Sequence, residues 1–225
     1  MKLILFDIDG TLIDSGGAGI RSLNYAFRDL FAVNDAFRKI DMAGKTDLQI
    51  IFEGLAAHGI NSDNGVVPEI VNVYLRHLGA EVQNNHKQLK PGVREALDAI
   101  SFMDGRYALG LLTGNLEQGA RLKLDAFKLN HYFSSGAFGS DNENRNLLLP
   151  VAAERFELIL GRRIDYKDCI VIGDTPRDVH CAKPHGASCV GVATGPYGVE
   201  ALMRAGADRV LPSLADTGAF LRALE

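Results

Sequence analysis

The sequence has little of what cross-linked, membrane-bound or nucleic-acid-binding proteins need. It has three cysteines, an odd number without metal-type spacing, so we expect Cys169, Cys181 and Cys189 to be reduced, mostly buried thiols. No apolar run approaches the length of a membrane span, and we expect no signal peptide before the first apolar segment. The six histidines are scattered and do not form the cysteine–histidine cluster of a transition-metal site. Together these features predict a cytoplasmic protein.

The charge of the chain is modest and of mixed sign. The net charge is −4 and there is no concentrated basic stretch, which argues against nucleic acid as the main partner. Of the 225 residues, 47% are hydrophobic and 23% are charged, as is usual for a globular protein. A chain of this length can form one or two domains and bury most of its unfolded surface without cross-links.

The first residues carry the strongest signal. An apolar run over residues 2–6 leads directly into the sequence Asp7-Ile8-Asp9-Gly10-Thr11. Such a run predicts a strand buried on both faces of a parallel sheet, so both aspartates follow the strand end, where open α/β sheets place their ligands. Two neighbouring carboxylates repel each other, and Mg²⁺, which prefers oxygen ligands, is the simplest compensation. The alternative is a turn in which the aspartates bond their own backbone.

A second apolar run ends in hydroxyl and amide residues. Residues 107–112 predict another strand, followed by Thr113-Gly114-Asn115 and by helical periodicity from about 116 to 127. Free backbone N–H groups at the start of such a helix favour an anion such as phosphate. The alternative is a turn that only caps the helix, and the sequence does not decide between the two.

A third apolar run, residues 169–173, leads into acidic residues. Thr175 is a typical N-cap and Pro176 a typical first helical residue. Asp174 then lies on the loop above the sheet edge, and Asp178 follows one helical turn later and can face the same centre. The alternative is an ordinary helix start, where acidic residues are favoured in any case.

The three segments, in this order, resemble the motifs of the haloacid dehalogenase superfamily of phosphotransferases, of the capped phosphoglycolate phosphatase and β-phosphoglucomutase type. The resemblance implies that Asp7 attacks phosphorus, forms an aspartyl-phosphate and ligates the metal. It also implies that Asp9 protonates the leaving oxygen, later activates water, and ligates the metal through its backbone carbonyl. A carboxylate nucleophile needs no base and divides one hard displacement into two easier ones. A second carboxyl beside an anion and a phosphate can have its pKa raised, which suits a general acid.

The resemblance gives roles to the other two motifs as well. Thr113 would bind the phosphoryl group, helped by the backbone amides of Gly114 and Asn115. Asp174 would be a direct Mg²⁺ ligand, and Asp178 a ligand through water or a partner of the ligands.

The sequence departs from the commonest family pattern at the fixed positive charge. Most relatives carry a lysine between the threonine and acidic motifs, but Lys123 and Lys128 come too early and Lys167 too late. Arg145, in the polar stretch 140–146, has the best position. Arginine keeps the charge and can bind an oxyanion with two nitrogens, although it is bulkier than lysine. The alternative is a solvated arginine in a loop.

The order of the remaining segments predicts the fold class, a doubly wound, mainly parallel (Rossmann-like) α/β core with an inserted helical-bundle cap. Helical periodicity replaces the strand signal between the first two strands, so we expect a cap over residues 15–86 and a core over residues 1–14 and 87–225. Further helices are expected at 19–32, 46–58, 67–82, 93–103 and 146–160. Further strands are expected at 187–192 and 209–211.

These features predict a Mg²⁺-dependent phosphatase that acts on a small phosphorylated metabolite, with no nucleic acid or membrane as partner. Asp9 favours phosphate-ester chemistry, because the dehalogenases of the superfamily lack this aspartate. A sugar-phosphate mutase is the alternative within the superfamily, and a phospho-aspartate signalling module is the alternative outside it. In the cap, Lys45 precedes an expected helix start and is a candidate substrate-binding residue. The glycine-rich stretch 16–19 lacks dinucleotide-binding spacing and suits a hinge.

Overall fold

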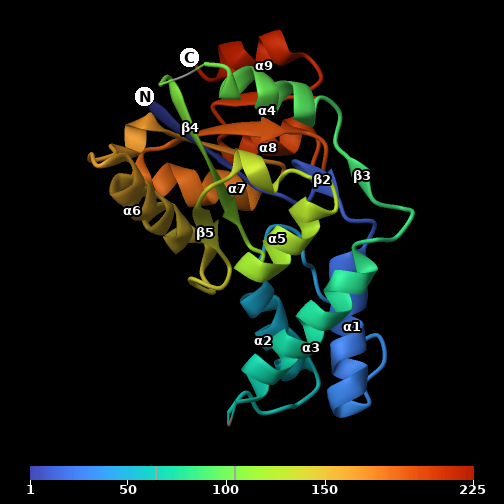
Figure 1. The fold of residues 1–225 in the computed structure, drawn as a ribbon. Coiled ribbons are helices and arrows are strands. Elements are labelled where there is room, and N and C mark those ends of the chain that lie inside the picture. Colours follow the sequence, from blue (N-terminus) through green and yellow to red (C-terminus); the bar gives the residue numbers. More distant parts are fainter. Residues whose placement is uncertain (64, 104) are drawn as a thin grey trace.

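The centre of the molecule is a six-stranded, wholly parallel sheet. The computed structural model describes residues 1–63, 65–103 and 105–225 (Figure 1). The strand order is β5-β4-β1-β6-β7-β8. The strands are β1 (Lys2–Phe6), β4 (Tyr107–Thr113), β5 (Gly136–Phe138), β6 (Cys169–Gly173), β7 (Ser188–Val192) and β8 (Arg209–Leu211). Because β1 lies between β4 and β6, the residues that follow these three strands meet at one edge of the sheet.

Helices cover both faces of the sheet, because neighbouring residues of a strand point to opposite faces. Ile4 and Phe6 of β1 pack in one cluster with α4 (Val93–Ser101), α5 (Glu117–Asp125) and α9 (Thr217–Ala223). Leu3 and Leu5 pack in another with α6 (Leu148–Leu160) and α7 (Pro176–Ala182). The helix α8 (Val199–Ala205) lies beside α7. This arrangement confirms the doubly wound α/β fold.

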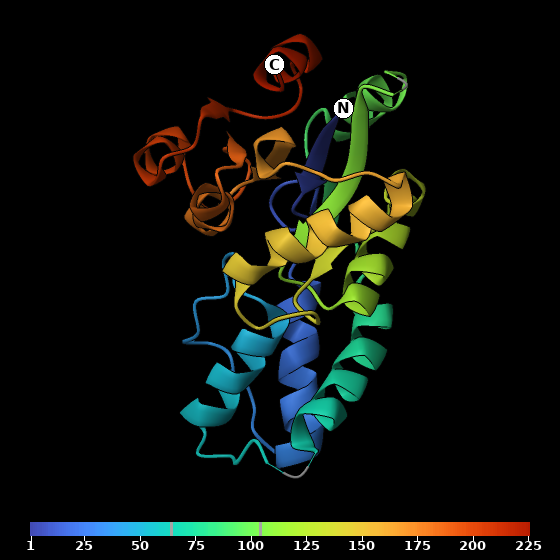
Figure 2. The same cartoon turned by 90° about the vertical axis from the view of Figure 1, so that its left-hand side faces the viewer.

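The remaining long helices form a second cluster near the carboxyl edge of the sheet. They are α1 (Ala18–Phe31), α2 (Asp47–Ala57) and α3 (Val66–Glu81). They pack around the buried side chains of Phe27, of Tyr74 and of Phe37 from the segment between α1 and α2. Figures 1 and 2 show these helices below the sheet, on the side where β1 and β4 end. None of the helices in the described residues is long and apolar enough to cross a bilayer.

Several short elements escaped the sequence analysis. The strands β5, β2 (Ile13–Asp14) and β3 (Gln88–Leu89) have two or three residues each, too few for a periodic signal. They form because a neighbouring strand supplies the hydrogen bonds, as β4 does for β5. The chain leaves and re-enters the core through the antiparallel pair β2 and β3. Short 3₁₀ turns lie at Asn130–Tyr132, Arg145–Leu147, Tyr166–Asp168 and Lys183–His185.

The helix expected from residue 146 starts later than predicted. A 3₁₀ turn over Arg145–Leu147 precedes α6, which begins at Leu148. The Asn144 side chain caps this turn by accepting a hydrogen bond from the Asn146 amide. The tighter turn places Arg145 at the sheet edge, in contact with the residues that follow β1 and β6.

Candidate active site

The loop after β1 approaches the loop after β6 closely, and glycine makes this approach possible. Gly10 has a φ of 85°, in the left-handed region, and a Cβ atom there would lie 2.3 Å from Oδ2 of Asp174. Thr11, the next residue, donates a hydrogen bond of 2.9 Å from its hydroxyl to Oδ1 of Asp174. The two acidic motifs, more than 160 residues apart in the chain, are therefore joined directly.

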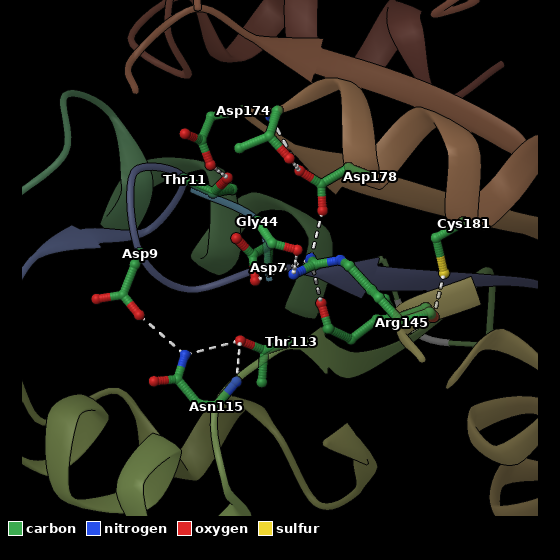
Figure 3. Close-up of polar contacts among 12 residues, drawn as sticks. Asp7, Asp9, Thr11, Gly44, Thr113, Asn115, Arg145, Asp174, Asp178 and Cys181 are labelled. Atoms are coloured by element: carbon green, nitrogen blue, oxygen red, sulfur yellow. Dashed lines mark hydrogen bonds and ion pairs between the residues drawn. The ribbon is translucent and has the colours of Figure 1, made fainter. Parts of the chain in front are cut away.

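A buried arginine links the first and last motifs. Nη2 of Arg145 lies 3.1 Å from Oδ1 of Asp7 and donates a hydrogen bond to Oδ1 of Asp178, while Nη1 donates to the Gly44 carbonyl at 3.2 Å (Figure 3). The Arg145 and Asp7 side chains are 5% and 6% exposed, and that of Asp178 is fully buried. Arg145 is therefore shared by two carboxylates and is not the solvated loop residue of the alternative interpretation.

The carboxylates outnumber the positive charge at this place. Asp7, Asp174 and Asp178 each offer an oxygen within 4.8 Å of the others. Burial raises the pKa of Asp7 to about 6, although Arg145 acts in the opposite direction, and Asp178 adds to the increase. Burial and the neighbouring Asp178 also raise the pKa of Asp174 well above its ordinary value. Three buried carboxylates against one guanidinium leave an excess of negative charge, which a divalent cation with oxygen ligands would fit.

Asp178 has a second structural task. Its Oδ2 accepts hydrogen bonds from the backbone N–H of Thr175 at 2.9 Å and from the Thr175 hydroxyl at 2.7 Å. Thr175 is the N-cap of α7 and Pro176 its first residue, as the sequence predicts. Because both Asp178 oxygens already have protein partners, this carboxylate holds Arg145 and the helix start together.

The residues after β4 face the same centre from the other side. Nδ2 of Asn115 donates to the Thr113 hydroxyl at 2.8 Å and to Oδ2 of Asp9 at 2.9 Å. At Gly114, a Cβ atom would lie 2.1 Å from the Lys45 carbonyl oxygen, and the Asp47 amide donates to the Gly114 carbonyl at 2.7 Å. The segment before α2 therefore packs directly on the Thr113–Asn115 loop.

The structure places an additional cation at the site, Lys123, which chain order had excluded as the fixed positive charge. Its side chain is 5% exposed, and Nζ lies 2.6 Å from Oδ2 of Asp9 and 2.6 Å from Oδ1 of Asn115. The sequence contains a signal for this position, because Lys123 stands on the buried face of α5 beside Ala120 and Leu124. A lysine on the apolar face of a helix needs a buried partner.

These residues surround a cavity of about 280 Å³ between the sheet edge and the helices α1 to α3. The sheet side is lined by the motif residues Asp7, Asp9, Thr113, Gly114, Asn115, Arg145 and Asp174, and by Lys123. The helical side is lined by Gly19, Ile20, Leu23, Met42, Lys45, Asp47, Ile50 and Tyr74. Lys45 thus borders the cavity, and its Nζ forms an ion pair of 2.6 Å with Glu53.

The fold and this acidic, arginine-centred site define a class of hydrolases that act at the carboxyl edge of an α/β sheet. A model of the haloacid dehalogenase-like hydrolase family matches residues 4–192. The chain therefore belongs to the haloacid dehalogenase-like hydrolases. Within that family it is an enzyme of the phosphatase class, which sets aside the signalling module considered from the sequence.

Individual relatives agree with this assignment. The chain is 28% identical to a phosphoglycolate phosphatase of Mesorhizobium japonicum over 202 residues, which is 86% of this chain and 83% of that protein. It is 24% identical to the phosphoglycolate phosphatase of Yersinia pestis over 95% of this chain and 90% of that one. Its fold is similar to that of CbbY from Rhodobacter sphaeroides in complex with phosphate, with a TM-score of 0.75, 19% identity, and 97% and 96% of the two chains covered.

Proposed function

We propose that this enzyme is a Mg²⁺-dependent phosphatase that hydrolyses a small phosphorylated metabolite through an aspartyl-phosphate on Asp7. The observation that carries the proposal is the buried cluster of Asp7, Arg145, Asp174 and Asp178 beside Thr113. It combines a nucleophile, a fixed cation and excess carboxylate oxygens at one sheet edge, the components that phosphoryl transfer needs.

Asp7 and Asp174 would hold the metal, with the backbone carbonyl of Asp9 as a further ligand and Asp178 acting through water or through Arg145. The excess of buried negative charge supports this donor set. When bound, Mg²⁺ would neutralise charge on the phosphoryl oxygens and on the carboxylates around them. We further propose residues 15–86 as the cap and residues 1–14 and 87–225 as the core.

Each of the site residues has a defined task in the proposed reaction. A carboxylate oxygen of Asp7 attacks phosphorus, the ester P–O bond breaks, and the leaving oxygen takes a proton from Asp9. Water then attacks the phosphorus of the aspartyl-phosphate and gives a proton to Asp9, the bond between phosphorus and the Asp7 oxygen breaks, and phosphate leaves. Arg145 holds the Asp7 carboxylate in place, and the Thr113 hydroxyl with the Gly114 and Asn115 amides binds the phosphoryl oxygens.

The substrate is proposed to be small and to place its organic part against the helical side of the cavity. The volume of about 280 Å³ suits a small phosphomonoester, and Lys45 borders the space that the leaving group would occupy. Similarity to phosphoglycolate phosphatases makes 2-phosphoglycolate the first compound to test. Location in the cytoplasm stays a prediction from the reduced cysteines.

The test begins with hydrolysis of 4-nitrophenyl phosphate in the presence of Mg²⁺ and after chelation. Asp7→Asn should abolish turnover, whereas Asp9→Asn should slow it, because it removes the proton donor and leaves the attacking atom. Circular dichroism of each variant verifies that the fold is retained. Near wild-type turnover by Asp7→Asn would contradict the covalent mechanism.

A second measurement addresses the substrate and the mutase alternative. Purified enzyme is incubated with a panel of phosphorylated metabolites, including 2-phosphoglycolate and several sugar phosphates, and inorganic phosphate is measured. We expect phosphate release to water. Transfer of the phosphoryl group to a sugar phosphate, without release, would support the mutase instead.

A further inference from the structure

The proposed acid–base residue is held by a buried clamp that the motifs of the family do not explain. Oδ2 of Asp9 accepts hydrogen bonds from Nζ of Lys123 at 2.6 Å and from Nδ2 of Asn115 at 2.9 Å. The Lys123 ammonium also donates to Oδ1 of Asn115 at 2.6 Å, which closes a triangle of three side chains. Figure 3 shows the Asp9 carboxylate turned toward Asn115.

The clamp fixes the orientation of Asn115 as well as that of Asp9. Because Lys123 can only donate, it holds the oxygen of the Asn115 amide, and the amide nitrogen must then face Asp9 and the Thr113 hydroxyl. None of these bonds uses Oδ1 of Asp9, so the clamp engages one of the two carboxylate oxygens. Burial alone would raise the pKa of Asp9, but the Lys123 ammonium and the Asn115 and Ser15 side chains outweigh burial and lower it, contrary to the raised pKa expected from the sequence.

Asp9 needs such support more than Asp7 does. The Asp9 side chain is 41% exposed and borders the cavity, whereas the Asp7 side chain is 6% exposed and is held by Arg145. Lys123 is rigidly placed, since it lies in α5 and is 5% exposed. The Asp47 carboxylate lies beside Lys123. Asp47 accepts a hydrogen bond of 2.9 Å from the Leu116 amide near the start of α5 and one of 3.4 Å from the Tyr74 hydroxyl.

We propose that Lys123 is a positioning residue for the reaction, which holds Asp9 through Oδ2 so that its other oxygen can pass a proton to the leaving group. This inference rests on the proposed function. A small displacement of a catalytic group can cost a large factor in rate, so a fixed anchor for a half-exposed carboxyl has a clear use. The fixed charge at the nucleophile remains with Arg145, and Lys123 acts at the leaving-group side.

The proposal predicts a dependence on the leaving group. A poor leaving group needs the proton from Asp9 as the ester bond breaks, whereas a good one departs with little help. Loss of Lys123 should therefore reduce the hydrolysis of phenyl phosphate much more than that of 4-nitrophenyl phosphate. A merely structural role would reduce both by the same factor.

The experiment measures kcat/KM of the Mg²⁺-loaded enzyme for both aryl phosphates. Lys123→Met should lower the value for phenyl phosphate at least about tenfold more than the value for 4-nitrophenyl phosphate. Lys123→Arg, which keeps the charge, should restore part of this difference. Lys167→Met, which removes an exposed lysine, is the matched control and should change neither value.

A double-mutant cycle shows whether Lys123 acts through Asp9. In the Asp9→Asn background, Lys123→Met should produce no further leaving-group-dependent loss. Equal losses on the two substrates, or an undiminished selective loss without Asp9, would overturn the proposal. If Lys123→Met does not fold, Lys123→Met combined with Asp47→Asn, which also removes a facing negative charge, is measured in its place. The Asp7→Asn variant distinguishes failure of the Lys123 proposal from failure of the proposed function, since turnover by Asp7→Asn would contradict the proposed function itself.

Discussion

Replacing Asp7 by asparagine should stabilise the metal-free protein although it abolishes turnover. Burial among carboxylates raises the pKa of Asp7 from 3.8 to about 6, so the folded state resists ionisation of this group more than the unfolded state does. The folded state therefore binds more protons than the unfolded state between about pH 4 and 6, and the free energy of unfolding falls as the pH rises through this window. Above about pH 6, the full destabilisation by ionised Asp7 is present.

The magnitude follows from the two pKa values. A pKa difference of one corresponds to about 1.4 kcal/mol. The ionisation of Asp7 therefore lowers the free energy of unfolding by about 3 kcal/mol at pH 7.5 and by about half of that at pH 5. Asparagine has nearly the same shape, and its oxygen can still accept a hydrogen bond from Arg145. Asp7→Asn should therefore be more stable than the wild type in the presence of a chelator, and more so at pH 7.5.

Urea denaturation at pH 5 and 7.5, with a chelator and then with Mg²⁺, measures this difference. Mg²⁺ should stabilise the wild type and have a much smaller effect on Asp7→Asn. Asp168→Asn, which removes an exposed carboxylate, is the control and should stay within about 0.5 kcal/mol of the wild type. If Asp7→Asn were less stable than the wild type at both pH values, the ion pair with Arg145 would outweigh burial, and the reasoning would be wrong.

Three further predictions concern the walls of the site. Arg145→Ala should lower kcat on 4-nitrophenyl phosphate about a hundredfold or more, and Arg145→Lys should have an intermediate kcat. A kcat of Arg145→Ala equal to that of the wild type would show that Arg145 is not the fixed charge. Gly114→Ala should lower both the melting temperature and activity, because its Cβ would lie 2.1 Å from the Lys45 carbonyl oxygen; an unchanged melting curve would show that the contact adjusts easily. Lys45→Ala should impair hydrolysis of the best metabolite but not of 4-nitrophenyl phosphate, and equal kcat/KM ratios would exclude Lys45 from substrate recognition.

The elements that depend on local sequence were predictable. The apolar runs before Asp7, Thr113 and Asp174 form strands, because they are long enough to show continuous burial. The start of α7 at Thr175 and Pro176 follows from capping preferences alone. The parallel order of the three strands then requires that the residues after them share one edge, which is why the motif residues could be expected at one place.

Other features were decided by tertiary contacts. The three residues of β5 become a strand only because β4 offers its edge. Arg145 could be proposed from its place in the chain, but its sharing between Asp7 and Asp178 depends on a 3₁₀ turn that local periodicity does not reveal. Lys123 was excluded by chain order and enters the site because α5 turns this residue inward.

The sequence by itself therefore determined which residues stand at the strand ends, whereas the tertiary structure decided which charges meet. Burial and hydrophobic periodicity are local properties, and they fix strands and helices within a few residues. The pairing of a buried ammonium or guanidinium depends on the geometry of several distant elements together. For Lys123 that geometry is set by the loops after β1 and β4 and by the buried face of α5, which no single stretch of the sequence contains.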